Sequence, residues 1–190
     1  MRSALFPLLL FALVALPACD ARAANTMPPG ELAKPGRVLM LRHAHAPGTG
    51  DPPDFRLGDC ATQRNLDAAG RAQAKALGET LRQAGITRAR VYSSQWCRCL
   101  ETARLLQLGH VDMLPALNSF YGREQERESR LAALRGFLAQ LPADGMPVVL
   151  VTHQVTITAF TDAGTPSGGG SLFQLNSSGS PRWLGAIGTD

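Results

Sequence analysis

The sequence predicts a three-layer α/β/α sandwich built around a mostly parallel sheet. Two short apolar runs, 37–42 and 146–152, have the length and the continuous apolarity of strands that are covered on both faces. They alternate with stretches of helical periodicity over 67–84, 95–108 and 125–141. A chain in which strands alternate with helices buries its apolar surface best as a parallel sheet between helices.

The elements can be placed along the chain from these signals. The proline- and glycine-rich stretch 24–36 is expected to be a linker that precedes a domain over 37–190. The first helix is followed by Gly85 as a stop signal. The other expected elements are a loop over 46–66, a strand over 89–93, a second helix over 95–108 capped by Ser94, a minor strand over 112–117, a loop over 118–124, a helix starting at 155–160, a loop over 164–171, and closing strands over 172–175 and 183–187.

The composition fits one globular domain that binds a small anion. The 190 residues are 45% hydrophobic and 18% charged, which is typical of a folded domain. The net charge is +4, and the basic residues are scattered without a lysine/arginine run or an aromatic-interleaved basic stripe. We therefore expect a small anionic substrate and no nucleic-acid partner.

The N-terminus has the pattern of an export signal. One early arginine precedes an apolar stretch over 4–18 and then small residues, a pattern too short for a comfortable membrane span. Residues 21–23 offer an A-x-A cleavage site, which predicts a signal peptide over 1–23. The preceding box, which ends at Cys19, is an alternative lipoprotein signal, and a lipid anchor there would be the only membrane attachment that we expect.

Export would permit a disulfide bond. Three cysteines follow the signal, so one of them must remain unpaired within a single chain. Cys60 can pair with either Cys97 or Cys99, and the alternative is three small buried thiols.

Polar residues stand at the points where three predicted strands end. They are Arg42-His43, Ser93-Ser94 and Thr152-His153. Because ligands of parallel sheets lie beyond the carboxyl ends of the strands, these residues are expected around one cleft. Arg98 falls in the first turn of the next helix, where backbone N–H groups and the helix dipole also favour an anion.

Two arginines, two histidines and a helix N-terminus suit a tetrahedral dianion. Arginine forks match phosphate oxygens, and a neutral imidazole can attack phosphorus to form a phosphohistidine. This chemistry requires no metal. His45 shares a strand face with His43, but no carboxylate or cysteine stands beside it to complete a metal site. We therefore expect His45 to line the mouth of the cleft.

Four stretches occur in a fixed order over about 37–160. They are LRHA at 41–44, RNLDAAGRAQA at 64–74, YSSQWCRCLETA at 92–103 and VVLVTHQ at 148–154. Together they resemble the motifs of the histidine phosphatase (phosphoglycerate mutase-like) superfamily. The resemblance implies a phosphoglycerate mutase-like fold and a metal-independent phosphoric monoester hydrolase without a cofactor.

The resemblance also assigns roles to individual residues. It implies that His43 is the nucleophile and that Arg42, Arg98 and His153 complete the phosphate pocket. Arg64 matches an arginine of small phosphohistidine-phosphatase relatives and is implied as a further pocket residue. Specificity is expected in the loops over 45–63 and 118–130.

A finer resemblance concerns the cellular location. The stretches CATQRNL and QWCRCLETA, together with the export signal, resemble a periplasmic branch that includes proteins linked to heptose-phosphate removal from the lipopolysaccharide core. This implies a periplasmic enzyme whose partner is a small phosphorylated substrate such as an envelope sugar phosphate.

The customary general acid of the superfamily is absent from both of its usual positions. Ser119 stands near the place of the mutase glutamate, and Gln154 follows the second histidine where acid phosphatases carry an aspartate. Either Glu124, with Glu126 and Glu128 behind it, supplies the proton, or the substrate has a good leaving group. The missing acid argues against a phosphomutase and keeps open a non-catalytic protein that binds phosphate.

Overall fold

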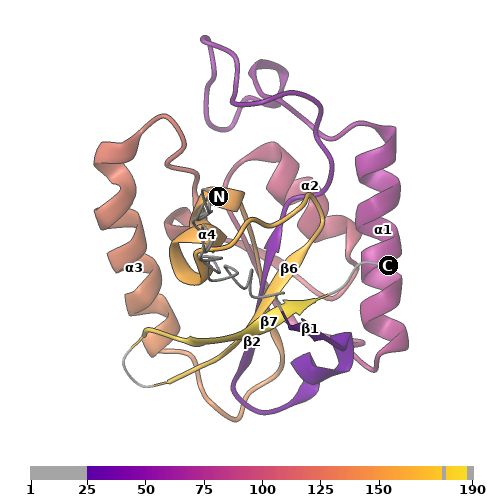
Figure 1. The fold of residues 1–190 in the computed structure, drawn as a ribbon. Helices are drawn as coiled ribbons and strands as arrows, with labels where there is room; N and C mark the ends of the chain where they lie inside the picture. Colours follow the sequence, from indigo (N-terminus) through magenta and orange to yellow (C-terminus); the bar gives the residue numbers. More distant parts are fainter. Residues whose placement is uncertain (1–24, 177–178, 188–190) are drawn as a thin grey trace, which may run out of the picture.

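The sheet at the centre of the molecule has seven strands in the order β1-β7-β6-β2-β5-β3-β4. The structure is a computed structural model that describes residues 25–176 and 179–187 (Figure 1). The strands are β1 (Thr26–Met27), β2 (Arg37–Arg42), β3 (Arg90–Ser93), β4 (Val111–Met113), β5 (Val148–Thr152), β6 (Gly170–Gln174) and β7 (Arg182–Ile187). β2, β5, β3 and β4 run parallel, whereas β6 is antiparallel to both β2 and β7.

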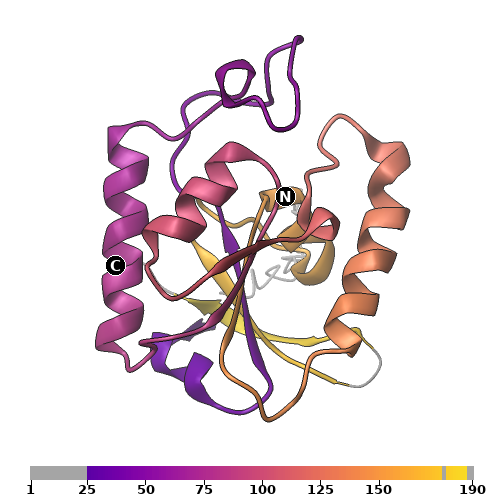
Figure 2. The same cartoon turned by 180° about the vertical axis from the view of Figure 1, so that it is seen from behind.

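Four α-helices cover the two faces of this sheet, which confirms the predicted three-layer fold class (Figures 1 and 2). They are α1 (Ala68–Gln83), α2 (Cys97–Leu105), α3 (Arg127–Ala139) and α4 (Gln154–Thr161). One apolar cluster joins α1 and α2 to one face of the sheet, and a second joins α3 and α4 to the other. None of the helices in the described part of the chain combines the length and the apolarity that a membrane crossing requires.

β2 shows why the apolar run over 37–42 is continuous. Leu39 and Leu41 belong to the cluster under α1 and α2, whereas Val38 and Met40 belong to the cluster under α3 and α4. Successive side chains of a strand point to opposite faces, so a strand covered on both faces needs apolar residues at every position. β5 is buried along its whole length for the same reason.

The parallel strands bring their carboxyl ends to one edge, as predicted. Arg42 pairs with Thr152 across β2 and β5, and the backbone N–H of His43 donates to the Thr152 carbonyl at 3.0 Å. The N–H of Ser94 donates to the Val151 carbonyl at 2.9 Å. The long connection from β2 to α1 extends beyond this edge (Figures 1 and 2).

The structure corrects two expectations about single elements, and a third lies outside its described residues. The stretch 24–36 is not a linker in its described part, because β1 pairs with β7, the 3-10 helix η1 (Pro29–Ala33) follows, and Leu32 lies fully buried in the core. The minor strand expected over 112–117 ends at Met113, where Pro115 starts the 3-10 helix η3 (Pro115–Leu117). The predicted signal peptide and Cys19 lie outside the described residues.

Two further boundaries shift for local reasons. The last two residues of the loop expected over 164–171 belong to β6 in the structure, and Gly170 pairs there with Leu41. A Cβ on Gly170 would approach the Leu39 side chain to 2.6 Å, so the glycine permits this close pairing. The third long helix is preceded by the 3-10 turn η4 (Glu124–Glu126).

Candidate active site

A cavity of about 850 Å³ lies at the carboxyl ends of the parallel strands. Its wall includes five of the six residues that the sequence predicted, namely Arg42, His43, Arg64, Arg98 and His153. The long loop after β2, the segment 119–123 and one side of α4 form most of the rest of its wall. Both of the loops expected to carry specificity therefore reach the cavity.

His43 is buried and held in the tautomer that a nucleophile needs. Its side chain is 3% exposed, and Nδ1 lies 2.8 Å from the carbonyl oxygen of Ala44. A carbonyl can only accept a hydrogen bond, so Nδ1 carries the proton and Nε2 keeps its lone pair. Burial, with the nearby charges of Arg98, Arg64 and Arg42, lowers the pKa of His43 to about 3, although the bond to Ala44 opposes the shift.

His153 lies beside His43 with their ring centroids 5.5 Å apart. Its Nε2 is 2.9 Å from the hydroxyl oxygen of Ser94 and 3.5 Å from the sulfur of Cys99. The Ser94 hydroxyl donates to Asn118 and the Cys99 thiol donates to the Thr152 carbonyl, so both atoms accept from a protonated Nε2. Burial and then Arg98 hold the pKa of His153 well below its ordinary value, which keeps the ring neutral.

Ser94 is predicted to cap the second helix. In the structure it lies two residues before the N-cap position, and its hydroxyl contacts His153. α2 begins at Cys97 with Trp96 at its N-cap position, and the backbone N–H of Cys97 donates to the Gln63 side chain at 3.0 Å. The buried Cys99 is the unpaired thiol, and burial raises its pKa to about 12, so it is protonated and available to donate.

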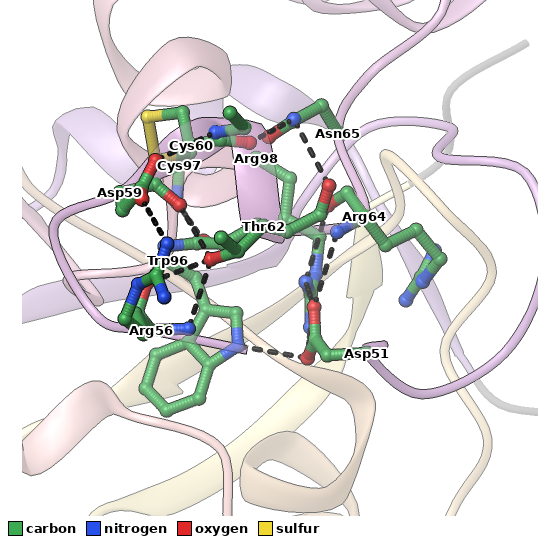
Figure 3. The surroundings of a disulfide bond; sticks show 12 residues. Asp51, Arg56, Asp59, Cys60, Thr62, Arg64, Asn65, Trp96, Cys97 and Arg98 are labelled. Carbon is green, nitrogen blue, oxygen red and sulfur yellow. Dashed lines mark hydrogen bonds and ion pairs between the residues drawn. A yellow bond between two sulfur atoms is a disulfide. The ribbon is translucent and has the colours of Figure 1, made fainter. Parts of the chain in front are cut away.

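Arg98 is held by a carboxylate that the sequence reading did not single out. Its guanidinium contacts Asp51 in two places, Nη1 to Oδ1 at 2.6 Å and Nη2 to Oδ2 at 3.1 Å (Figure 3). The Trp96 indole N–H donates to the same carboxylate at 2.9 Å. Burial alone would raise the pKa of Asp51, but the bonds from Arg98 and Trp96 outweigh it and lower the pKa, so Asp51 is ionised.

Arg42 and Arg64 complete a cluster of three cations. Arg42 Nη1 donates to the Thr165 carbonyl at 2.7 Å, and Arg64 Nε donates to the Gly50 carbonyl at 2.7 Å. Burial, followed by the charge of Arg98, lowers the pKa of both groups. Within the described residues, the buried Nε of Arg42 and that of Arg98 have no hydrogen-bond partner. The cluster therefore retains donors that a phosphate oxygen can satisfy.

The hydrogen bonds of Thr102 and one disulfide bond hold α2 against this cluster. The Thr102 hydroxyl accepts from the backbone N–H of Ala44 at 3.0 Å and donates to the Arg98 carbonyl at 2.7 Å. A disulfide joins Cys60 to Cys97, the residue before Arg98 (Figure 3). This resolves the pairing that the sequence left open between Cys97 and Cys99.

The structure does not bring Glu124 into the cavity. Glu124 is exposed on η4 and is absent from the cavity wall, which instead contains its neighbour Arg123. Glu126 pairs with Arg130 at 2.8 Å, and Glu128 pairs with Arg127 at 2.6 Å. The 3-10 turn sets the direction of these side chains, and a charge pattern alone does not reveal it. The carboxylates that do line the cavity are Asp51 and Asp162.

His45 also differs from its expected place. It is exposed, its Nε2 lies 3.6 Å from Asp67, and it is not part of the cavity wall. Across the described ranges, no group of three or more histidine, cysteine, aspartate or glutamate residues is arranged to hold a metal ion.

The loop residue Asp51 and the aromatic Trp96 are the site residues that sequence reasoning missed. Trp96 stacks on Phe55 with centroids 5.0 Å apart and meets His153 edge-on at 5.3 Å. The only available signal for Asp51 was an acidic residue inside a glycine- and proline-rich loop, DPPD at 51–54, which is common in ordinary turns.

Comparison with known proteins gives a match of part of the chain to one family and several solved structures of one fold. Residues 38–124 match the model of the histidine phosphatase superfamily (branch 1). No curated protein sequence matches the chain.

Several solved structures are similar to this chain. The protein histidine phosphatase SixA, complexed with tungstate, is 15% identical with a TM-score of 0.57, covering 80% of this chain and 97% of its own. Mycobacterial glucosyl-3-phosphoglycerate phosphatase with inorganic phosphate is 18% identical with a TM-score of 0.56, covering 81% and 97%. A mutant phosphoserine phosphatase from Entamoeba histolytica, in complex with phosphoserine, is 15% identical with a TM-score of 0.54, covering 81% and 98%.

At these identities the likenesses show the fold, which is the phosphoglycerate mutase-like fold that the sequence predicted. The matched segment 38–124 contains Arg42, His43, Arg64 and Arg98, and His153 joins them from β5 across the sheet edge. Residues 38–124 are therefore similar to the histidine phosphatase superfamily (branch 1), and the fold of the whole described chain is similar to that of the solved phosphatases.

Proposed function

We propose that this protein is a phosphatase that hydrolyses a phosphomonoester through a phosphohistidine on His43, without a metal. The observation that carries the proposal is the unprotonated Nε2 of His43 in a cavity whose wall also holds three arginines. The superfamily match and the phosphatases among its structural neighbours support a phosphoric monoester hydrolase.

The residues suggest a two-step reaction. Arg42, Arg64 and Arg98 bind the oxygens of the phosphoryl group and stabilise the charge that builds on them. His43 Nε2 forms a bond to phosphorus while the bond from phosphorus to the leaving oxygen breaks, and the leaving group departs with the electron pair. A water molecule then attacks the phosphohistidine, releases inorganic phosphate and restores the neutral histidine.

The proton for the leaving group is the weakest part of this site. Of the two carboxylates on the cavity wall, Asp51 is bonded to Arg98, which keeps it ionised and therefore unable to donate, and Asp162 is the one that is not part of the arginine cluster. General acid catalysis typically contributes ~10²–10⁴-fold to the rate, and poor leaving groups depend on it most. A site without a proton donor favours leaving groups that need the proton less, such as those of aryl phosphates, acyl phosphates and phosphohistidine.

Export to the periplasm is part of the same proposal, with an envelope sugar phosphate as a substrate only where its leaving group needs little protonation. The signal pattern over 1–23 supports export. The Cys60–Cys97 disulfide agrees with it, because disulfides persist in oxidising compartments.

The test is hydrolysis of an aryl phosphate by the full chain in excess chelator. Wild type should release phosphate, and a stopped reaction should contain acid-labile phosphate bound to the protein. His43→Ala should lose both signals. His110→Ala is the matched control, because His110 is 87% exposed and lies outside the cavity. Phosphate binding without any turnover by wild type would instead support a non-catalytic phosphate-binding protein.

A further inference from the structure

Arg123 lies on the outer wall of the cavity against two aromatic rings. Its guanidinium carbon is 5.2 Å from the centroid of Phe55 and 5.6 Å from that of Trp96. The two rings are themselves stacked. Cation–π contacts of this kind orient a guanidinium while leaving its N–H groups free to donate.

The neighbouring cations are neutralised, but Arg123 is not. Arg127 pairs with Glu128, and Arg130 pairs with Glu126. In the ranges that the structure describes, the Arg123 side chain has neither an ion pair nor a hydrogen bond. It is also half-buried, so part of its hydration is already lost. A half-buried cation without a carboxylate, in the wall of an open cavity, is a site for an anion.

The phosphoryl group that reacts does not need this charge. Arg42, Arg64 and Arg98 with the ionised Asp51 leave two net positive charges around His43, which matches a phosphate dianion. A chain of ring contacts connects His43 to His153, His153 to Trp96, and Trp96 to the Arg123 guanidinium.

We propose that Arg123 binds a second anionic group, carried by the leaving-group part of the substrate. This inference rests on the proposed phosphatase function and narrows its substrate class to phosphomonoesters whose other end bears a carboxylate or a second phosphate. The aromatic pair Phe55 and Trp96 would flank the segment that connects the two anions. Arg123 is then a specificity residue and takes no part in the reaction at phosphorus.

Binding of non-hydrolysable phosphonates tests this without depending on turnover. Calorimetry on the full chain would compare linear alkylphosphonates with α,ω-alkylenebisphosphonates of the same chain length, over a series of lengths. At the best length the bisphosphonate should bind about tenfold more tightly or better, well above the twofold expected from its two equivalent ends. In Arg123→Gln the ratio should fall to about that statistical twofold, and Arg123→Lys should retain part of it.

The matched control is Arg135→Gln, since Arg135 also stacks on an aromatic ring, Phe160 at 5.6 Å, but lies outside the cavity wall. It should keep the wild-type ratio. A ratio near two at every length in wild type, or a ratio that survives in Arg123→Gln, would overturn the inference. A purely structural Arg123 would weaken both ligands together and leave the ratio unchanged. Failure of aryl phosphate hydrolysis with an intact ratio would instead overturn only the proposed function.

Discussion

Loss of the Cys60–Cys97 disulfide should destabilise the fold by an amount set mainly by the loop that it closes. The two cysteines are separated by 37 residues. In the chain-entropy description, cross-linking a loop of that size lowers the entropy of the unfolded state, which stabilises the fold by about 4 kcal/mol at 25 °C. For a domain of this size that corresponds to a fall in Tm of roughly 8–16 °C. The bond also fixes the loop that carries Asp51 to the helix that carries Arg98 (Figure 3).

The assay is urea and thermal unfolding of the double variant Cys60→Ala/Cys97→Ala beside wild type, each with and without reductant. Wild type should lose the stability difference when reductant is added, and the double variant should not respond to reductant at all. The free thiol of Cys99 serves as the internal control, because it is present in every sample. A double variant within about 1 kcal/mol of oxidised wild type would refute the reasoning, since the entropic effect would then be absent.

Three further outcomes follow from the site. Asp51→Ala leaves the 3%-exposed Arg98 side chain without its carboxylate, so the free energy of unfolding should fall by about 3–5 kcal/mol. Millimolar phosphate should raise the Tm of this variant more than that of wild type. An equal phosphate effect on both proteins would contradict the pairing. The folded-state pKa of His43, lowered to about 3, lies below the unfolded value, so its contribution to stability is complete above pH 6.5 and is lost as the pH falls toward 3, by up to about 1.4 kcal/mol per unit. Urea midpoints should therefore fall less steeply in His43→Ala, and equal slopes would count against the assignment. Gln154→Asp places a carboxylate on the cavity wall at the position that acid phosphatases use. The kcat/KM for alkyl phosphates should therefore rise by about tenfold or more relative to that for aryl phosphates. A constant ratio between the two substrates would show that no acid was restored.

The parts of the site that strands carry were predictable from the sequence. Arg42, His43 and His153 stand at the ends of apolar runs, and the rule that parallel strands end at one edge predicts that they lie together. Arg98 was predictable from its place in the first turn of a helix. These residues are positioned by periodic patterns, which a sequence displays directly.

The parts that loops carry were not predictable. Asp51 reaches Arg98 through a turn rich in glycine and proline, and Arg123 reaches Phe55 across two loops that are distant in sequence. No period relates such positions, so only tertiary structure shows that they meet. Glu124 illustrates the same difficulty. It is the first residue of η4 and is exposed, whereas Arg123, directly before it, lines the cavity.

Asp51 also explains how three arginines can be kept in one partly buried cluster. Burial and then the charge of Arg98 lower the pKa of both Arg42 and Arg64, so the positive charges of the cluster repel one another. The carboxylate of Asp51 offsets one of these charges, and in the proposed function a phosphate dianion would offset the other two. The loop over 45–63 is therefore as much a part of the cavity wall as the strand ends are. Because the disulfide ties this loop to α2, changes in the loop that alter specificity must preserve the position of Asp51 or lose Arg98 with it.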